Sequence, residues 1–144
     1  GSYFLRLPYE DFCQAFGLSP TQKYESDGGI GIGDMMNKLL YSSNSNDRRQ
    51  FMQTQFLFWL LAAIDGHAKN FSLAIEKQGR YHLSPVYDVL SSYPMLGGKG
   101  WHHSELQMAM SLRSTQKGKN GIGIKFTLNI SMPQLSLSDL AQVI

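Results

Sequence analysis

The longest hydrophobic run of the chain lies near its middle, from Phe56 to Ile64, and covers nine residues without a break. It closes the segment 47–64, in which the apolar positions cover nearly the whole helical circumference over the last two turns. We therefore predict a central, buried helix over 47–64. The polar stretch "SSNSND" at 42–47 interrupts the pattern before it, and its last residues can cap the helix.

Beyond Asn70 the hydrophobic period changes from helical to two. The stretches "FSLAIE" at 71–76 and "RYHLS" at 80–84 flank Lys77-Gln78-Gly79. Two short alternating runs around a glycine-containing turn are typical of a β-hairpin. The order in the middle of the chain is thus a buried helix, a polar loop and a hairpin.

A first helix is predicted near the start, because its apolar residues recur at i, i+3, i+4 and i+7. They are Tyr9, Phe12, Cys13 and Phe16. Gly17 is placed to end this helix. The residues 24–34 form a glycine-rich loop, after which Asp34 is expected to cap a helix carrying Met35, Leu39 and Leu40.

The last third of the chain is more mixed. We expect a flexible "GGKG" at 97–100, a short helix around 104–112, a strand at 121–130 and the first turns of a helix at 136–144. No internal repeat is present. The predicted fold class is mainly α, within α+β.

Composition limits the class of protein. A chain of 144 residues with 42% hydrophobic and 17% charged residues suits one globular domain, and a net charge of +2 gives no argument for nucleic acid or membrane binding. Cys13 is the single cysteine, which excludes an internal disulfide and fits a reducing compartment. The longest apolar run is half of the roughly 18 residues that span a membrane, so we expect a soluble cytoplasmic protein. Gly1-Ser2 is expected to be a scar of tag cleavage.

The polar residues after the apolar run have a spacing that suits phosphoryl transfer. Asp65 and Asn70 are five positions apart, and Tyr87-Asp88-Val89 follows the hairpin. Protein kinases place a base and a magnesium-binding asparagine five positions apart, and a second metal-binding aspartate after a short hairpin. Asp65, next to an apolar helix, is expected to be partly desolvated. Spacing alone leaves a structural alternative open, in which Asp65 caps the helix end and Asn70 satisfies backbone groups.

Other sites are disfavoured. "GGIGIGD" at 28–34 matches neither a dinucleotide fingerprint nor a Walker loop, and a structural or substrate-facing loop is expected there. Trp101-His102-His103 lacks the supporting ligands of a metal site. No serine elbow or cysteine nucleophile accompanies Asp65-Gly66-His67, so hydrolase chemistry is remote.

Three stretches carry a resemblance to a known family. "DGHAKNFSLAI", "YHLSPVYDVLSSYP" and "RLPYEDFCQAFG" with "KYESDGG" resemble the C-terminal lobe of HipA-type serine/threonine kinases, the toxin halves of bacterial toxin–antitoxin pairs. The resemblance implies a lobe of the protein-kinase type that uses ATP and magnesium. It assigns Asp65 as the base and Asn70 and Asp88 as magnesium ligands. Nucleotide-binding positions follow in the same way: His67, Ala68, Lys69, Asn70, Tyr87 and Asp88.

The resemblance also implies partners. The family phosphorylates serine or threonine in protein targets such as aminoacyl-tRNA synthetases, and a helix-turn-helix antitoxin restrains it, so DNA is met only through the antitoxin. The quoted motifs cover residues 5 to about 117 and fade after Lys119, and no N-terminal lobe precedes them. We therefore expect a fragment, a truncated gene product or one part of a split kinase whose other lobe is separate. The alternative is a catalytically silent module that binds an antitoxin or a partner lobe.

Overall fold

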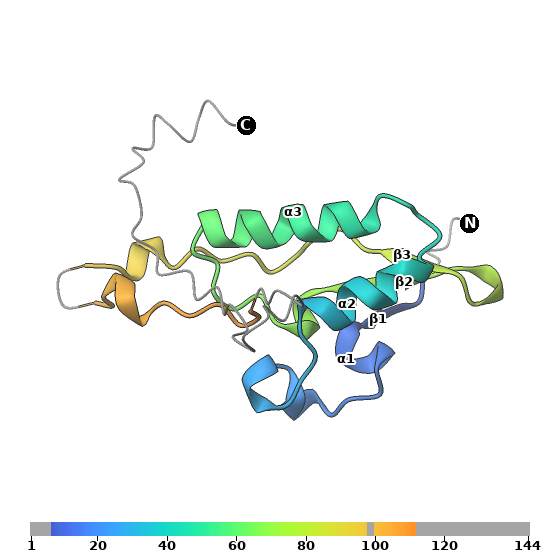
Figure 1. Cartoon of the computed structure of the whole chain (residues 1–144), viewed down its shortest axis with the longest axis horizontal. Coiled ribbons are helices and arrows are strands. Elements are labelled where there is room, and N and C mark those ends of the chain that lie inside the picture. Colours follow the sequence, from blue (N-terminus) through green and yellow to red (C-terminus); the bar gives the residue numbers. More distant parts are fainter. Residues whose placement is uncertain (1–6, 98–99, 112–144) are drawn as a thin grey trace, which may run out of the picture.

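The computed structural model describes residues 7–97 and 100–111 (Figure 1). Its strands are β1 (Tyr9–Asp11), β2 (Ser72–Ile75) and β3 (Tyr81–Leu83), and its α-helices are α1 (Phe12–Ala15), α2 (Ile32–Lys38) and α3 (Asp47–Leu60). Short 3₁₀ turns cover Pro20–Gln22, Glu25–Asp27, Leu39–Tyr41, Ala68–Asn70, Lys77–Gly79, Tyr93–Met95 and His103–Glu105. Helices and a small sheet together confirm the α+β class.

The sheet has the order β1-β2-β3, and both pairings are antiparallel. The predicted hairpin is confirmed as β2 and β3, with Ile75 opposite Tyr81 across the turn. The core of the described residues buries side chains from α1, α2, α3, β2 and β3 and from the loop before β2, and it includes four phenylalanine rings. Phe51 and Phe58 from α3 both contact Phe71, with ring centroids 5.1 and 5.6 Å apart.

The N-terminal helix is shorter than its pattern predicts. Tyr9 belongs to β1 and is exposed, whereas Phe12 and Cys13 at the start of α1 are buried. Asp11 breaks the helical pattern, because its side chain accepts a hydrogen bond from the N–H of Gln14 at 2.9 Å and caps α1. The expectation of one helix from residue 9 was therefore wrong at its first turn.

Gly17 ends α1 as predicted, since it has a φ of +66°, in the left-handed region that glycine adopts readily. The next helix begins earlier than expected. α2 starts at Ile32, and the carboxylate of Asp34 accepts a hydrogen bond from the N–H of Gly31 at 3.1 Å. Asp34 thus reaches back from within the first turn and is not the residue that precedes the helix.

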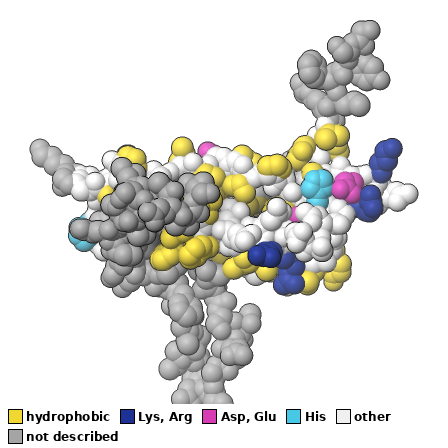
Figure 2. All heavy atoms as spheres, turned by 90° about the horizontal axis from the view of Figure 1, so that it is seen from above, with side chains coloured by type: hydrophobic (Ala, Val, Ile, Leu, Met, Phe, Trp, Pro, Cys, Tyr) yellow, Lys and Arg dark blue, Asp and Glu magenta, His cyan; other side chains and the backbone are white. Residues whose placement is uncertain are grey.

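The long helix α3 is confirmed, but it is shorter and less buried than predicted. Phe51, Thr54, Gln55 and Phe58 form its buried face. Phe56 and Leu57 are 59% and 46% exposed, although they belong to the unbroken apolar run. The reason is that α3 lies along one side of the described fold and packs through one face (Figure 1). Hydrophobic side chains also lie on the surface seen from that side (Figure 2).

The end of α3 explains why the helix stops before Ile64. Ala62 has a φ of +48°, and the N–H of Ala63 donates to the carbonyl of Phe58 at 2.8 Å. This is the pattern of a left-handed helix terminus, here with alanine in the place that glycine usually takes. The segment after β3 runs back to this point, where the N–H of Ser92 and the hydroxyl of Tyr93 donate to the carbonyls of Ala62 and Leu60.

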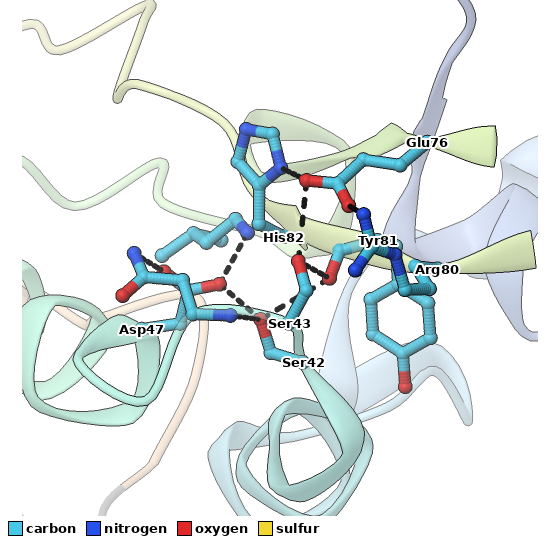
Figure 3. Close-up of polar contacts among 9 residues, drawn as sticks. Ser42, Ser43, Asp47, Glu76, Arg80, Tyr81 and His82 are labelled. Atoms are coloured by element: carbon cyan, nitrogen blue, oxygen red, sulfur yellow. Dashed lines mark hydrogen bonds and ion pairs between the residues drawn. The ribbon is translucent and has the colours of Figure 1, made fainter.

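A polar cluster ties the start of α3 to the hairpin (Figure 3). Asp47 is fully buried, and its carboxylate accepts hydrogen bonds from the Ser42 hydroxyl, the Asn44 amide and the N–H of Leu83 at 2.5–2.6 Å. Next to it, Glu76 on the hairpin accepts a hydrogen bond from the Ser43 hydroxyl and pairs with His82 and Arg80. The His82 hydrogen bond lowers the pKa of Glu76.

The end of the described chain is irregular. A 3₁₀ turn at His103–Glu105 replaces the helix expected around 104–112, and the chain from 106 to 111 has no helix. Its polar contacts are with other segments, as when the N–H of Ala109 donates to the carbonyl of Ile64. The predicted strand at 121–130, the final helix and part of the 97–100 loop lie outside the described residues. In the part of the chain that is described, no helix is long and apolar enough to cross a membrane.

Candidate functional site at the loop between α3 and β2

The loop that follows α3 carries most of the predicted site residues. The N–H of His67 donates to the Asp65 carbonyl at 2.9 Å, and the N–H of Asn70 donates to the His67 carbonyl at 3.0 Å. Gly66 lies against the Phe58 ring, where a Cβ would approach the ring carbons to 2.3 Å. The loop is therefore compact and is held against the aromatic core.

The structure brings Asn70 and Asp88 together across the hairpin. The buried Asn70 amide donates from Nδ2 to Oδ2 of Asp88 at 2.8 Å. Its Oδ1 accepts a hydrogen bond from the N–H of His67 at 3.1 Å, which fixes which end of the amide faces Asp88. The two predicted metal ligands are thus neighbours, and the Asn70 amide presents its nitrogen, not its oxygen, to Asp88.

Asp88 has an unusual backbone conformation, with a φ of +56°. Few residues other than glycine adopt this left-handed region, although aspartate and asparagine tolerate it best. The side chain of Asp88 is exposed. The strained backbone aims an accessible carboxylate at the loop, and strain of this kind gathers at functional sites.

Asp65 differs from its predicted environment. Because α3 ends at Leu60, four residues of irregular chain separate the helix from Asp65, whose side chain is exposed and not partly desolvated. Its Oδ1 accepts a hydrogen bond from the hydroxyl of Tyr24 at 2.8 Å. Its Oδ2 has no hydrogen bond within the described residues and is free to meet a substrate group.

His67 is the most enclosed polar group of the loop. Its side chain is 6% exposed, and its Nδ1 has no hydrogen-bond partner among the described residues. Burial lowers the pKa of His67, while the nearby carboxylates of Asp65 and Asp88 oppose this and Lys23 adds to it. The imidazole is therefore neutral near pH 7 and sits among three charged groups of the site.

Lys69 and Tyr87 brace the loop from outside. The Lys69 ammonium pairs with the Asp11 carboxylate at 2.5 Å, and this hydrogen bond raises the pKa of Lys69. The Tyr87 hydroxyl donates to the Lys69 carbonyl at 2.8 Å and lies 2.5 Å from the Ser72 hydroxyl. The contacts of both side chains in this structure connect the loop to β1 and β2.

The donor set of the site fits magnesium in kind. Carboxylate and amide oxygens are its usual protein ligands, and it commonly takes only one or two of them beside phosphate and water. Asp88 offers an accessible carboxylate oxygen, whereas Asn70 would bind through the second lone pair of Oδ1 or after its amide turns. Within the described ranges, no three His, Cys, Asp or Glu side chains gather as a metal site of their own.

Tyr24 is the site residue that the sequence did not reveal. It lies 41 residues before Asp65, and neither its spacing nor its neighbours indicate the contact. In the glycine-rich loop after it, Gly31 immediately precedes α2, and its N–H donates to the Asp34 carboxylate. That this loop is not a phosphate-binding motif stays a prediction.

The fold and the site together define a small α+β lobe in which acidic and amide groups gather where a helix meets a hairpin. Comparison with known families gives a match to the HipA-like C-terminal domain over residues 2–142. The chain belongs to this family, which confirms the resemblance. The match extends beyond Lys119, past the quoted motifs.

Named relatives agree with this membership. The chain is 35% identical to Putative kinase Y4mE of Sinorhizobium fredii over 98 residues, which are 65% of this chain and 23% of that protein. It is 32% identical to Putative kinase Y4dM of the same organism over 90 residues, 62% of this chain and 21% of that protein. Homologues named as kinases support a kinase at the level of the family.

A solved structure has a similar fold. It is the Shewanella oneidensis MR-1 toxin–antitoxin complex of HipA, HipB and operator DNA, which matches with a TM-score of 0.59 at 28% identity. The match covers 74% of this chain and 26% of that chain. The present chain thus spans about a quarter of the length of the proteins it matches.

Proposed function

We propose that this chain is the magnesium- and substrate-binding lobe of a serine/threonine protein kinase that transfers the γ-phosphoryl group of ATP. The observation that carries the proposal is the 2.8 Å contact between Asn70 and Asp88, which come from separate segments yet meet beside the loop of Asp65. In this function, Asp65 accepts the proton of the attacking hydroxyl through its free Oδ2. Asn70 and Asp88 hold magnesium, which when bound neutralises charge on the phosphates.

The remaining loop residues have supporting parts in the proposal. His67 is part of the proposed nucleotide site, where its buried Nδ1 would meet a phosphate only after the loop opens. Lys69 and Tyr87 complete the proposed nucleotide-binding surface, whereas Ala68 is fully buried and packs beneath it. Most of the adenine and phosphate contacts of a kinase come from an N-terminal lobe. We therefore expect weak Mg·ATP binding by this chain alone.

The proposed partners follow from the family. The Shewanella HipA is seen with HipB and operator DNA. We propose that this chain likewise binds an antitoxin and contacts DNA only through that complex. We also propose that its substrate is a protein such as an aminoacyl-tRNA synthetase. The N-terminal lobe would be covalently joined or a separate polypeptide.

Calorimetric titration of ATP into this chain, with and without magnesium, tests the proposal. We expect weak binding that requires magnesium and is lost in Asp88→Asn. Asparagine tolerates the backbone conformation of residue 88, so this variant keeps the fold and removes the charge. An ATP affinity that neither requires magnesium nor falls in Asp88→Asn would show that Asp88 is not a ligand.

A further inference from the structure

Tyr24 contacts the loop of Asp65 from a segment that is distant in the sequence. Its hydroxyl donates to Oδ1 of Asp65 at 2.8 Å, and its ring meets the His67 ring edge-on with centroids 5.0 Å apart. One side chain thus touches both polar residues that flank Gly66. Tyr24 is half-buried, so its ring position is set by its surroundings.

The segment that carries Tyr24 is itself fastened to the loop. The Lys23 carbonyl accepts a hydrogen bond from the N–H of Ala68 at 3.2 Å, and the Lys23 ammonium lies 4.8 Å from the centre of the Tyr24 ring. The Tyr24 carbonyl accepts hydrogen bonds from Asp27 and Gly29, which close a tight turn behind it. Backbone contacts on both sides therefore hold the hydroxyl where it meets Asp65.

We propose that Tyr24 is a positioning residue that orients the carboxylate of Asp65, an inference that rests on the proposed function of Asp65 as base. An exposed aspartate at a loop end can turn about two side-chain bonds. A hydrogen bond to Oδ1 restricts this rotation and leaves Oδ2 directed toward a substrate hydroxyl. Orientation of this kind contributes to rate and not to nucleotide affinity.

Tyr24→Phe tests the contact on the chain itself, because it removes the hydroxyl and keeps the ring against His67. We expect amide hydrogen exchange at His67 and Ala68 to be about 3- to 10-fold faster, the loss expected for one hydrogen bond, and the Asp65 carboxyl carbon signal to move at pH 7. Tyr41→Phe is the matched control, since Tyr41 is 80% exposed and its hydroxyl has no hydrogen bond within the described residues. Unchanged exchange and an unmoved signal in Tyr24→Phe would overturn the proposal.

A double-mutant cycle separates the Tyr24–Asp65 contact from general loosening. Asp65→Asn keeps an oxygen that accepts the hydrogen bond of the Tyr24 hydroxyl, so amide exchange at His67 and Ala68 should match that of the wild type. Asp65→Ala removes the acceptor, so the exchange should be as fast as in Tyr24→Phe. The double variant Tyr24→Phe/Asp65→Ala should be no faster than either single variant, because both remove the same interaction. Additive effects would mean that the two residues act independently, which contradicts the proposal.

The catalytic consequence is measured in a two-lobe kinase that has this chain as its C-terminal lobe. Tyr24→Phe should lower kcat about tenfold and leave the KM for ATP within about twofold. A raised KM with an intact kcat would assign Tyr24 to nucleotide binding and refute the positioning role. If Asp65→Asn leaves turnover unchanged, the proposed function of Asp65 as base fails. In that case the amide exchange rates and the Asp65 carboxyl carbon signal still show whether Tyr24 orients Asp65.

Discussion

Gly66 offers a sharp test of how the candidate loop is held. The residue lies between Asp65 and His67, directly against the ring of Phe58. An ideal Cβ at this position would be 2.3 and 2.4 Å from Cδ2 and Cε2 of that ring. Because carbon atoms in contact lie about 3.5–4.0 Å apart, Gly66→Ala requires a shift of more than about 1 Å.

The ring has little room to make that shift. Phe58 is 1% exposed, and its ring centroid is 5.6 Å from that of Phe71. Forcing one methyl group into a filled core costs about 1–3 kcal/mol of unfolding free energy. We expect Gly66→Ala to lose that amount, and to weaken Mg·ATP binding as well, because the loop is the more easily displaced side of the contact.

Gly33 provides the matched control. It lies in α2, and a Cβ added there would meet nothing within 4 Å. Gly33→Ala should raise the unfolding free energy by about 0.5–1 kcal/mol, since alanine is the better helix former. Urea unfolding at 25 °C measures both variants, and the two substitutions should differ in sign with unchanged m-values.

A second substitution identifies the cause of the loss. Phe58→Leu removes the ring atoms that a methyl group at residue 66 would meet. The double variant Gly66→Ala/Phe58→Leu should therefore be more stable than the sum of the single losses predicts. Wild-type stability of Gly66→Ala, or strict additivity in the double variant, would refute the packing of the loop on Phe58.

Three further predictions concern single side chains. Asp47→Ala should lower the unfolding free energy in urea by about 2–4 kcal/mol, because it leaves the buried N–H of Leu83 and two side-chain donors without their acceptor; a loss under about 1 kcal/mol would contradict this role. Burial holds the pKa of His67 below its ordinary 6.5. The unfolded chain therefore binds a proton at a higher pH than the folded chain does, and the unfolding free energy should fall as pH falls below 6.5. Urea titrations from pH 7.5 to 5 should show a smaller fall in His67→Gln, and an identical pH profile would count against the buried imidazole. Asp65→Asn in a two-lobe kinase should lower the transfer rate about 10²- to 10⁴-fold, and near-normal turnover would exclude Asp65 as base.

The parts of the fold that depend on neighbouring residues could be predicted from the sequence. The hairpin follows from alternation on both sides of Lys77-Gln78-Gly79, and its turn has positive φ at Gln78 and Gly79. The stop at Gly17 is equally local. The order of Asp65, Asn70, hairpin and Asp88 is compatible with the observed contact between Asn70 and Asp88, because a hairpin returns the chain to its starting edge. Their roles as magnesium ligands stay a prediction.

The parts that failed depend on distant residues. β1 has three residues, too few to show a period, and it exists because Glu10 lies opposite Leu73 on β2. The hydroxyl of Tyr24 reaches Asp65 only because the backbone of the preceding residue is bonded to the loop. Likewise, an apolar run cannot tell which side of α3 the rest of the chain covers, so Phe56 was expected to be buried.

The polar residues of the chain separate into two groups by what they do for the fold, and this bears on the choice between a kinase lobe and a silent binding module. Asp47 is buried and satisfies three donors, so the fold itself accounts for it. Asp65 and Asp88 are exposed and each accepts one side-chain hydrogen bond, and Asp88 does so from a strained backbone that glycine would relieve. Asp65 contributes little to stability by these contacts, whereas Asp88 also supplies the acceptor for the buried Asn70 amide. A silent module predicts that Asp88→Asn has no functional cost, whereas a kinase lobe predicts that the same change abolishes magnesium-dependent ATP binding.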